Sequence, residues 1–277
     1  MSGAVRFVVP AAPADAVEES LFEWFGDVAF SAAREASGDL SVWVGREDAA
    51  EAKAILERFG VPGVLSFEEA ARDWVAEAAA LRKSVAVGRY LLDPHDGALA
   101  TAPAPGQVRI HLPAARAFGT GSHESTRLAL RLLLGEALSG RRVLDVGCGA
   151  GTLAFVAALE GAAWTAAFDL DLDAALATRE HARANRIGRV GAFAGPLDAL
   201  RDGARFDVAA ANMILEEVAP LLGGIRRRLD PGGRLVSSGL LAEREREWDD
   251  LLWRSGFRVI RSLTENEWLG TVAESFE

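Results

Sequence analysis

Residues 143–152 read VLDVGCGAGT, and this stretch decides the fold. A predicted buried strand leads directly into a turn with three glycines, which leave no Cβ between the backbone and a ligand. A helix then begins with its free N–H groups facing the same place. Gly151 follows Gly149 by two residues, whereas the last glycine of the dinucleotide fingerprint GxGxxG follows the second by three. The spacing favours a nucleoside over a pyrophosphate, and Asp145, Gly147 and Gly149 become candidate contacts.

A second predicted strand, at residues 165–169, ends in an acid. A carboxylate at Asp169 can accept both ribose hydroxyls of a nucleoside. The nearby Asp171 and Asp173 fit helix N-capping and first-turn charge instead. Strand, glycine turn, helix and acidic strand end together favour S-adenosylmethionine as the cofactor.

From residue 125 onward, predicted strands and helices alternate, as in a mostly parallel sheet with helices on both faces. The strands are expected at 142–146, 165–169, 190–194, 206–211 and 234–238, and the helices at 126–138, 152–159, 172–185, 216–229 and 242–255. Two last strands, near 257–263 and 267–273, would have to form a hairpin at one edge. The pattern predicts an α/β domain with a Rossmann-like, seven-stranded sheet of the class I methyltransferase type.

The first part of the chain has a different order, βαββαβ, which predicts a ferredoxin-like α+β sandwich. Its strands are expected at 5–9, 28–34, 40–44 and 64–67, and its helices at 14–25 and 48–59. A helical and then Pro- and Gly-rich stretch follows, with one or two short strands, such as 108–112. The expected division is an N-terminal domain at 1–67, a connector at 68–113 and a methyltransferase domain at 114–277.

Composition limits the classes of partner. The 277 residues include 40 acidic and 30 basic side chains, a net charge of −10. This charge argues against direct nucleic-acid binding and suits a basic protein substrate. The basic clusters at 141–142 and 226–228 are expected to be solvated charge at strand or helix ends. No apolar run reaches the roughly 18 residues of a membrane span, and the single cysteine excludes an internal disulfide, so a cytoplasmic location is expected.

Two further segments fall beside the predicted ligand site. The stretch 117–126 (AFGTGSHEST) sets two glycines in a polar loop before a helix, which favours backbone close to a ligand. A mobile connector with Ser125 or Thr126 as helix N-cap is an equal alternative. Asn212 follows the fourth strand, at the edge where open α/β sheets bind ligands, and its carbonyl can accept from a substrate amine. A turn asparagine is the alternative there, and no aromatic residue follows to stack a flipped base.

The sequence lacks the residue patterns that metal binding, thiolate chemistry, hydrolysis or nucleoside triphosphate binding would need. The four histidines have no metal-ligand spacing and are expected to be structural or on the surface, so no metal site is predicted. Cys148 lies within the glycine turn, where small size matters more than thiolate chemistry. The chain has neither a GxSxG elbow nor a GxxxxGK[ST] loop, which argues against hydrolase and nucleoside triphosphatase functions.

Together these segments resemble one family, the bacterial ribosomal protein methyltransferase PrmA, which modifies the eleventh protein of the large ribosomal subunit. The matching stretches are 117–130 (AFGTGSHESTRLAL), 143–153 (VLDVGCGAGTL), 168–171, 211–215 and 232–241 (GGRLVSSGLL). AFGTGxH is the specific part, because most methyltransferases share the glycine turn. The chain departs from the family at 112–116 (LPAAR), where an aspartate, a proline and then a glycine are usual.

The resemblance implies a set of residues around S-adenosylmethionine: Thr126, Gly147, Asp169 and Asn212 in contact with it, and Phe118 and Gly119 folded over it. Asn212 is also the catalytic candidate, since methyl groups would pass to amine nitrogens of a large-subunit ribosomal protein, on lysines and the N-terminus. The N-terminal domain would recognise that protein. Two alternatives stay open: a methyltransferase of the same fold for another protein lysine or a small amine, and a non-catalytic nucleoside-binding module.

Overall fold

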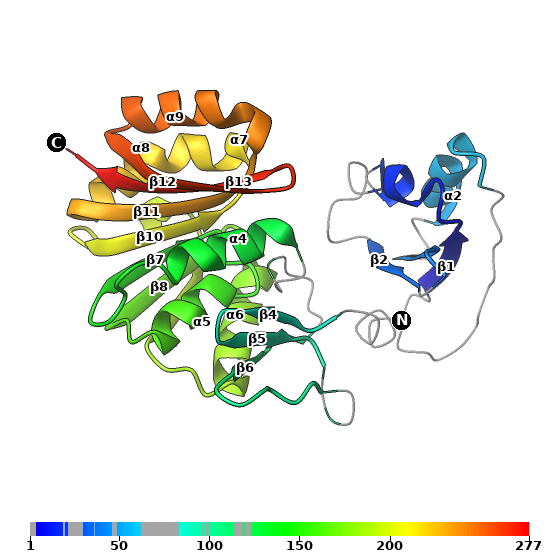
Figure 1. Ribbon diagram of the computed structural model, residues 1–277, viewed down its shortest axis with the longest axis horizontal. Coiled ribbons are helices and arrows are strands. Elements are labelled where there is room, and N and C mark those ends of the chain that lie inside the picture. Colours follow the sequence, from blue (N-terminus) through cyan, green and yellow to red (C-terminus); the bar gives the residue numbers. More distant parts are fainter. Residues whose placement is uncertain are drawn as a thin grey trace. The chain divides into compact units, whose positions relative to one another are not determined.

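The computed structural model describes residues 4–18, 20–21, 30–35, 37–45, 49–61, 83–95, 97, 100–113, 119 and 123–276. The chain divides into two compact units: unit 1 comprises residues 1–83 and 97–99, and unit 2 comprises residues 84–96 and 100–277 (Figure 1). Within the described ranges, no helix has the length and apolar character needed to cross a bilayer. The candidate site residues between 118 and 212 all belong to unit 2.

Unit 1 contains a three-stranded antiparallel sheet in the order β1-β3-β2. Its elements are β1 (Ala4–Val9), β2 (Phe30–Arg34), β3 (Leu40–Gly45) and α2 (Ala49–Arg58), and residues 14–18 and 20–21 are also helical. Phe7, Val42 and Leu56 are buried in its core. The strand expected at 64–67 lies outside the described residues, so the ferredoxin-like sandwich stays a prediction.

Unit 2 is built around a seven-stranded sheet in the order β12-β13-β11-β10-β7-β8-β9. Its strands are β7 (Arg142–Val146), β8 (Trp164–Asp169), β9 (Val190–Ala194), β10 (Phe206–Asn212), β11 (Leu229–Leu241), β12 (Phe257–Glu265) and β13 (Trp268–Ser275). The first five pair in parallel, and β13 is antiparallel to both β11 and β12. The Rossmann-like, class I methyltransferase arrangement is therefore confirmed, with the expected hairpin at one edge.

Helices cover both faces of this sheet, as Figure 1 shows. One face carries α4 (Glu124–Leu133), α5 (Thr152–Leu159) and α6 (Leu172–Ala184), and the other carries α7 (Leu215–Val218), α8 (Leu222–Arg228) and α9 (Glu245–Arg254). Successive side chains of a strand point to opposite faces. Val143 accordingly packs in one core with Phe155 of α5, and Leu144 packs in the other with Trp248 of α9.

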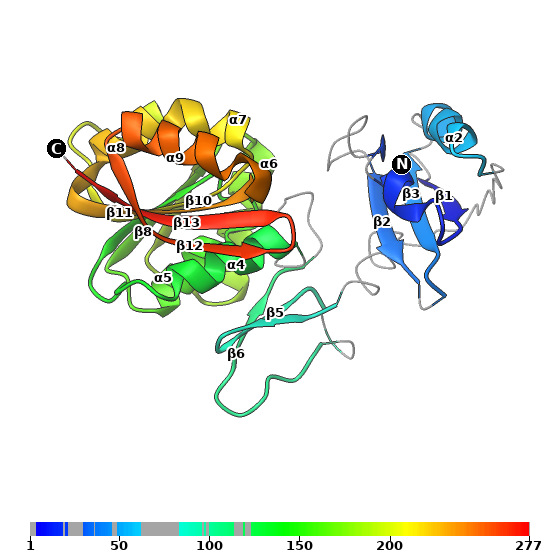
Figure 2. The same cartoon turned by 45° about the horizontal axis from the view of Figure 1, so that its top comes forward.

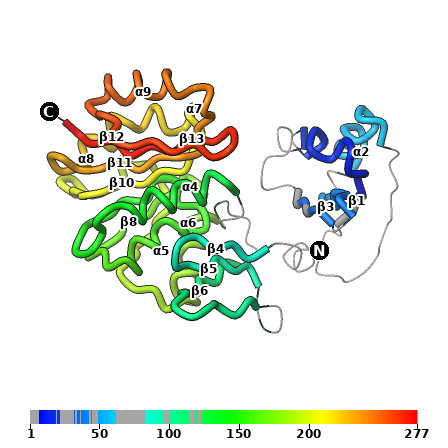
Figure 3. The backbone as a smooth tube through the Cα atoms, in the orientation of Figure 1, coloured from blue at the N-terminus to red at the C-terminus, as the bar shows by residue number. Residues whose placement is uncertain are grey.

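A second, smaller sheet of unit 2 precedes α4. It contains β4 (Val85–Val87), β5 (Tyr90–Asp93) and β6 (Val108–His111) in that order. Figure 2 separates it from the large sheet, and in Figure 3 it lies next to α5 and α6. Asn185, the C-cap of α6, accepts the His111 N–H at 2.7 Å and donates to the His111 carbonyl at 2.6 Å. The later part of the expected connector therefore packs as part of unit 2, while residues 68–82 lie outside the described residues.

Several elements differ from their predicted forms. Helix α4 spans Glu124–Leu133 rather than 126–138, and the helix predicted at 242–255 begins with a 3₁₀ helix at Ala242–Arg244. The helix expected at 216–229 is interrupted by a 3₁₀ helix at Ala219–Leu221, because Pro220 has no N–H to donate. The strand expected at 234–238 is longer. It starts at Leu229 through a register shift against β10, and it continues to Leu241 because β13 pairs with its last residues.

Candidate active site

Three candidate residues lie at the carboxyl edge of the large sheet, because the parallel strands that carry them are neighbours. Gly147 follows β7, Asp169 ends β8 and Asn212 ends β10. β7 is the middle strand of the three. From β7 the chain continues to β8 and β9 on one side, and it then returns to β10 on the other side of β7. Ligands of open α/β sheets bind at such a switch point.

The glycine turn has the backbone conformation that its sequence requires. Gly147, Gly149 and Gly151 have φ of +66°, +50° and +87°, in the left-handed region that favours glycine. A Cβ on Gly151 would come within 2.5 Å of the Phe155 ring, and one on Gly147 within 3.0 Å of Met213 Sδ. Gly151 is the N-cap of α5 and offers no side-chain cap. Among the first N–H groups of this helix, that of Ala154 is bonded to the Asp145 carboxylate.

Asp169 is bonded to the same turn. Its Oδ2 accepts the Gly149 N–H at 3.0 Å, and its Oδ1 accepts the Asp171 N–H at 3.0 Å. Each carboxylate oxygen has a second lone pair, so both oxygens can still accept from a ligand. Beside it, the Leu170 side chain is 78% exposed. The pair offers acceptors for hydroxyl groups next to an apolar surface for a flat ring.

Asp145 has a different setting, beneath the turn. It is 1% exposed, and its Oδ2 accepts the Ala154 N–H of α5 at 3.0 Å. Its Oδ1 has no partner within the described part of the chain. Burial, helped by the charge of Asp169, raises the pKa of this carboxyl to about 7. The bond to α5 gives Asp145 a role in holding the turn and the helix start; its direct contact with the cofactor stays a prediction.

Asn212 lies against the first turn of α4. Its Nδ2 donates to Thr126 Oγ1 at 3.1 Å, and Thr126 is 1% exposed. The other end of the amide, Oδ1, is buried and has no hydrogen-bond partner among the described residues. An unpaired buried carbonyl costs roughly 1–3 kcal/mol, so such a group indicates an acceptor waiting for a ligand donor.

In the loop ahead of α4, the structure describes Gly119 and His123. Gly119 has φ of +92°, and its carbonyl accepts a hydrogen bond from the hydroxyl of Thr152, the first residue of α5. The N-cap of α4 is His123, which accepts the Ser125 N–H, so the cap at Ser125 or Thr126 that belonged to the alternative interpretation is wrong. Phe118 and residues 120–122 lie outside the described residues. The bond from Thr152 brings the two glycine segments of the sequence together.

Several residues that support the turn had no clear signal in the sequence. Thr178 of α6 donates to the Gly149 carbonyl at 2.8 Å, and His181 Nδ1 donates to the Ala150 carbonyl at 3.0 Å. Burial raises the pKa of the Cys148 thiol, so Cys148 stays protonated and its small size suits the turn. Outside the turn, at the N-cap of α4, the His123 ring meets the Trp268 ring edge to face, with 4.7 Å between the ring centroids. Of these residues, Cys148 was expected from the sequence to serve by its small size, whereas Thr178 and His181 carried no local signal.

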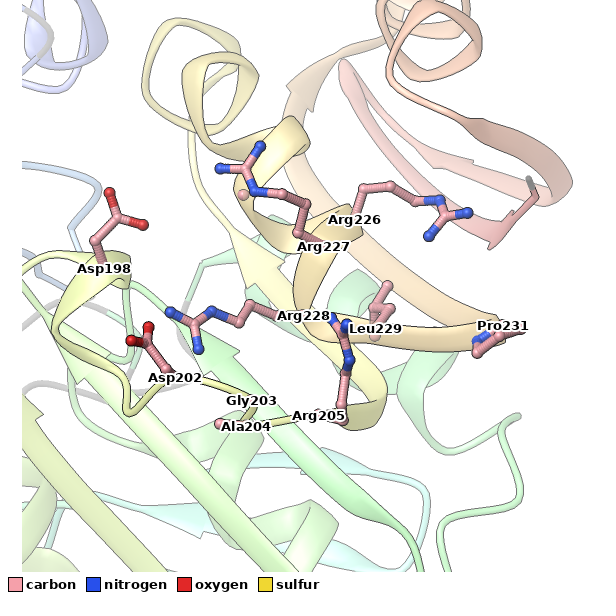
Figure 4. A pocket seen from close by; sticks show the side chains of 11 residues that line it. Asp198, Asp202, Gly203, Ala204, Arg205, Arg226, Arg227, Arg228, Leu229 and Pro231 are labelled. Carbon is pink, nitrogen blue, oxygen red and sulfur yellow. The ribbon is translucent and has the colours of Figure 1, made fainter.

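A pocket of about 490 Å³ lies at the amino ends of the parallel strands, away from the candidate site, beside the starts of β10 and β11 (Figure 4). Its charged lining residues are Asp198, Asp202, Arg205, Arg226, Arg227 and Arg228. Arg226 donates to the Phe276 carbonyl, and Arg228 donates to the carbonyls of Leu200 and Arg201. Figure 4 shows the three consecutive arginines pointing in different directions, so their guanidinium groups do not converge on one ligand. This agrees with their expected place at a helix end.

Comparison with known proteins shows the family of the chain. The family model described as ribosomal protein L11 methyltransferase (PrmA) matches residues 63–275. The ribosomal protein L11 methyltransferase of Deinococcus radiodurans is 35% identical over 209 residues, which cover 73% of this chain and 76% of the relative. Those of Trichlorobacter lovleyi and Methylococcus capsulatus are 36% and 41% identical over 71% and 55% of this chain. This chain spans only 66% and 52% of the length of these two relatives.

A solved structure has the same fold. The crystal structure described as a ribosomal protein L11 methylase from Lactobacillus delbrueckii subsp. bulgaricus has a TM-score of 0.60 against this chain. The match covers 68% of this chain and 96% of that one, at 24% sequence identity. At that identity the likeness supports the arrangement of strands and helices alone.

Proposed function

The chain belongs to the ribosomal protein L11 methyltransferase (PrmA) family, and from that premise we propose that it transfers methyl groups from S-adenosylmethionine to amine nitrogens of a large-subunit ribosomal protein. The observation that carries the proposal is the buried Oδ1 of Asn212, which has no partner among the described residues and lies two strands away from Asp169, next to the glycine turn. An acceptor for an amine and a cradle for a nucleoside thus lie at one sheet edge.

The residues around the turn fit the cofactor. Asp169 offers free lone pairs on both oxygens for the ribose hydroxyls, and Leu170 offers an exposed apolar face for the adenine. The glycines remove side chains from the path between backbone and ligand. Gly119, bonded to Thr152, would cover the cofactor from the α4 side. When bound, S-adenosylmethionine supplies an electrophilic methyl group with its leaving group already in place.

The protein's own contribution is to position the amine and to exclude water. Asn212 Oδ1 accepts one N–H of a neutral amine, which leaves the nitrogen lone pair free and fixes its direction. A lysine must first lose a proton, because its unperturbed pKa is about 10.4. Apolar surroundings lower that pKa, since burial disfavours the charged form. Met213 and Ile214, directly after Asn212, are apolar, and water can carry the proton away.

The cofactor assignment is tested by Asp169→Ala in calorimetry. We expect S-adenosylmethionine binding to become undetectable while the thermal transition stays cooperative, because the ribose loses its acceptors. Asp202→Ala, which removes an acid at the opposite sheet edge, is the matched control and should bind as the wild type does. Equal affinities for the Asp169 variant and the control would reject the nucleoside site.

The substrate assignment needs a separate assay. The protein is incubated with labelled S-adenosylmethionine and a bacterial lysate, and labelled species are identified by mass spectrometry. Label on lysine or N-terminal amines of a large-subunit ribosomal protein is the expected result. Label on another protein or a small amine would favour a same-fold methyltransferase with a different substrate. Binding of the cofactor without any formation of S-adenosylhomocysteine would favour a non-catalytic module.

A further inference from the structure

The amide of Asn212 has two chemically different ends, and only one of them has a partner among the described residues. Nδ2 can only donate, and it donates to Thr126 Oγ1 at 3.1 Å. Oδ1 can only accept, and it is buried with no donor in the described part of the chain. A rotation of the amide by half a turn would instead point two N–H groups at an incoming amine, whose own N–H groups would oppose them.

Thr126 accepts from Nδ2 in the observed orientation, and after the rotation its hydroxyl would have to turn and donate to Oδ1 instead. It lies in the first turn of α4, is 1% exposed, and its β-branched side chain has few rotamers. The other side of the same turn is attached to the hairpin between β12 and β13, where Asn266 donates to Glu124 at 2.7 Å. The hydroxyl therefore presents its oxygen to Asn212 from a rigid element rather than from a loop.

We propose that Thr126 is a positioning residue for the methyl acceptor: by holding Nδ2 of Asn212, it directs Oδ1 toward the substrate amine. This role rests on the proposed function and differs from the cofactor contact that the family resemblance implies for Thr126. It acts through Asn212, so its loss changes the rate of transfer at saturating cofactor rather than the affinity for cofactor alone.

The test compares Thr126→Val, which keeps the shape and removes the acceptor, with Thr126→Ser, which keeps the acceptor. With saturating S-adenosylmethionine, kcat for the protein substrate should fall about 10–100-fold in the valine variant, as a misdirected group commonly causes. The serine variant should restore kcat to within about threefold, a difference of less than 1 kcal/mol. A raised cofactor Kd with full kcat at saturation would overturn the proposal in favour of a cofactor contact only.

Thr165→Val is the matched control. Thr165 is fully buried in β8, and its hydroxyl has no partner among the described residues, so the same atom exchange removes no hydrogen bond. We expect its kcat to equal that of the wild type. A fall as large as in Thr126→Val would assign the loss to a general effect of burying valine and would overturn the proposal.

A double-mutant cycle isolates the action through Asn212. In an Asn212→Ala background, Thr126→Val should have no further effect on kcat, because no amide remains to be directed. Additive losses would overturn the positioning role. A wild type that transfers no methyl group rejects the proposed function instead. In that case the ¹H–¹⁵N side-chain signals of Asn212 still test the hydrogen bond: they should shift in Thr126→Val and not in Thr165→Val, and unchanged signals in both would overturn it.

Discussion

Asp145 combines full burial with a carboxylate of which one oxygen accepts the Ala154 N–H. Burial raises its pKa from 3.8 to about 7, so the folded protein holds a proton that the unfolded chain releases above about pH 4. The stabilisation from this proton is fully present below the unfolded pKa and is lost as the pH rises through the folded pKa. Stability should therefore decrease between these two values.

Asp145→Asn provides the measurement, because the asparagine carbonyl can still accept the Ala154 N–H but does not titrate. Between about pH 5 and about pH 8, the free energy of unfolding of the wild type should fall by roughly 2–3 kcal/mol relative to the variant. Urea denaturation at the two pH values gives both numbers, and all other titrating groups cancel in the difference. A difference that does not change with pH would mean that Asp145 is ionised throughout.

Among the elements, those around the glycine turn could be predicted from local sequence. β7, α5 and β9 have the predicted bounds, because buried apolar runs and glycine breaks leave little choice there. Helix α4 could not be placed so well: it starts at Glu124, behind an N-cap histidine, and ends just before Gly135. N-capping by histidine is uncommon compared with Ser, Thr, Asp or Asn, which made Ser125 and Thr126 the natural choice.

The candidate site shows the same limit. The positions of Asp169 and Asn212, each at the carboxyl end of a strand, could be predicted from the sequence, while their contacts with a ligand stay predictions. The hydrogen bond between Asn212 and Thr126 joins residues 86 positions apart, and it exists because α4 packs against the large sheet. No local pattern carries that information. Phe118, which belongs to the AFGTGxH stretch of the family resemblance, lies outside the described residues, and its role stays a prediction.

The hairpin between β12 and β13 should control the rigidity of α4. The Glu265 carboxylate forms ion pairs with both Arg127 and Arg131 of that helix. We expect Glu265→Gln to lower stability by no more than about 1 kcal/mol, because these pairs are partly exposed. Local opening of α4 should nevertheless become easier, since its first turns lose their attachment. Hydrogen exchange of a peptide covering residues 124–133 measures this, and faster exchange is expected.

Glu274→Gln serves as the comparison for that variant. Glu274 also forms ion pairs with two arginines, Arg234 and Arg258. Its side chain is 27% exposed, close to the 24% of the Glu265 side chain. It lies toward the other end of β13, away from α4. Exchange in residues 124–133 should be unchanged in this variant. Equal acceleration in both variants would indicate a general loss of stability rather than a specific attachment.

On the scale of the whole molecule, unit 2 has the cores that a separate domain needs. The two described core clusters of its sheet faces run from Val87 to Val272 and from Leu144 to Ala273, and β4, β5 and β6 contribute to the first. Unit 1 has its own described cluster, between Phe7 and Val61. Because each cluster is confined to one unit, the cofactor site should not depend on unit 1 for its folding.

A chain of residues 84–277 tests that separation. It should unfold in one cooperative transition and bind S-adenosylmethionine with a Kd within about threefold of the full chain, less than 1 kcal/mol. If unit 1 recognises the protein substrate, as the family resemblance implies, kcat/KM for that substrate should fall at least about tenfold, or 1.4 kcal/mol, because contacts made before the chemical step are lost. Calorimetry and a methyl-transfer assay on both chains separate the two effects. Full activity of the shorter chain would place substrate recognition within unit 2, and loss of cofactor binding would show that the two units fold together.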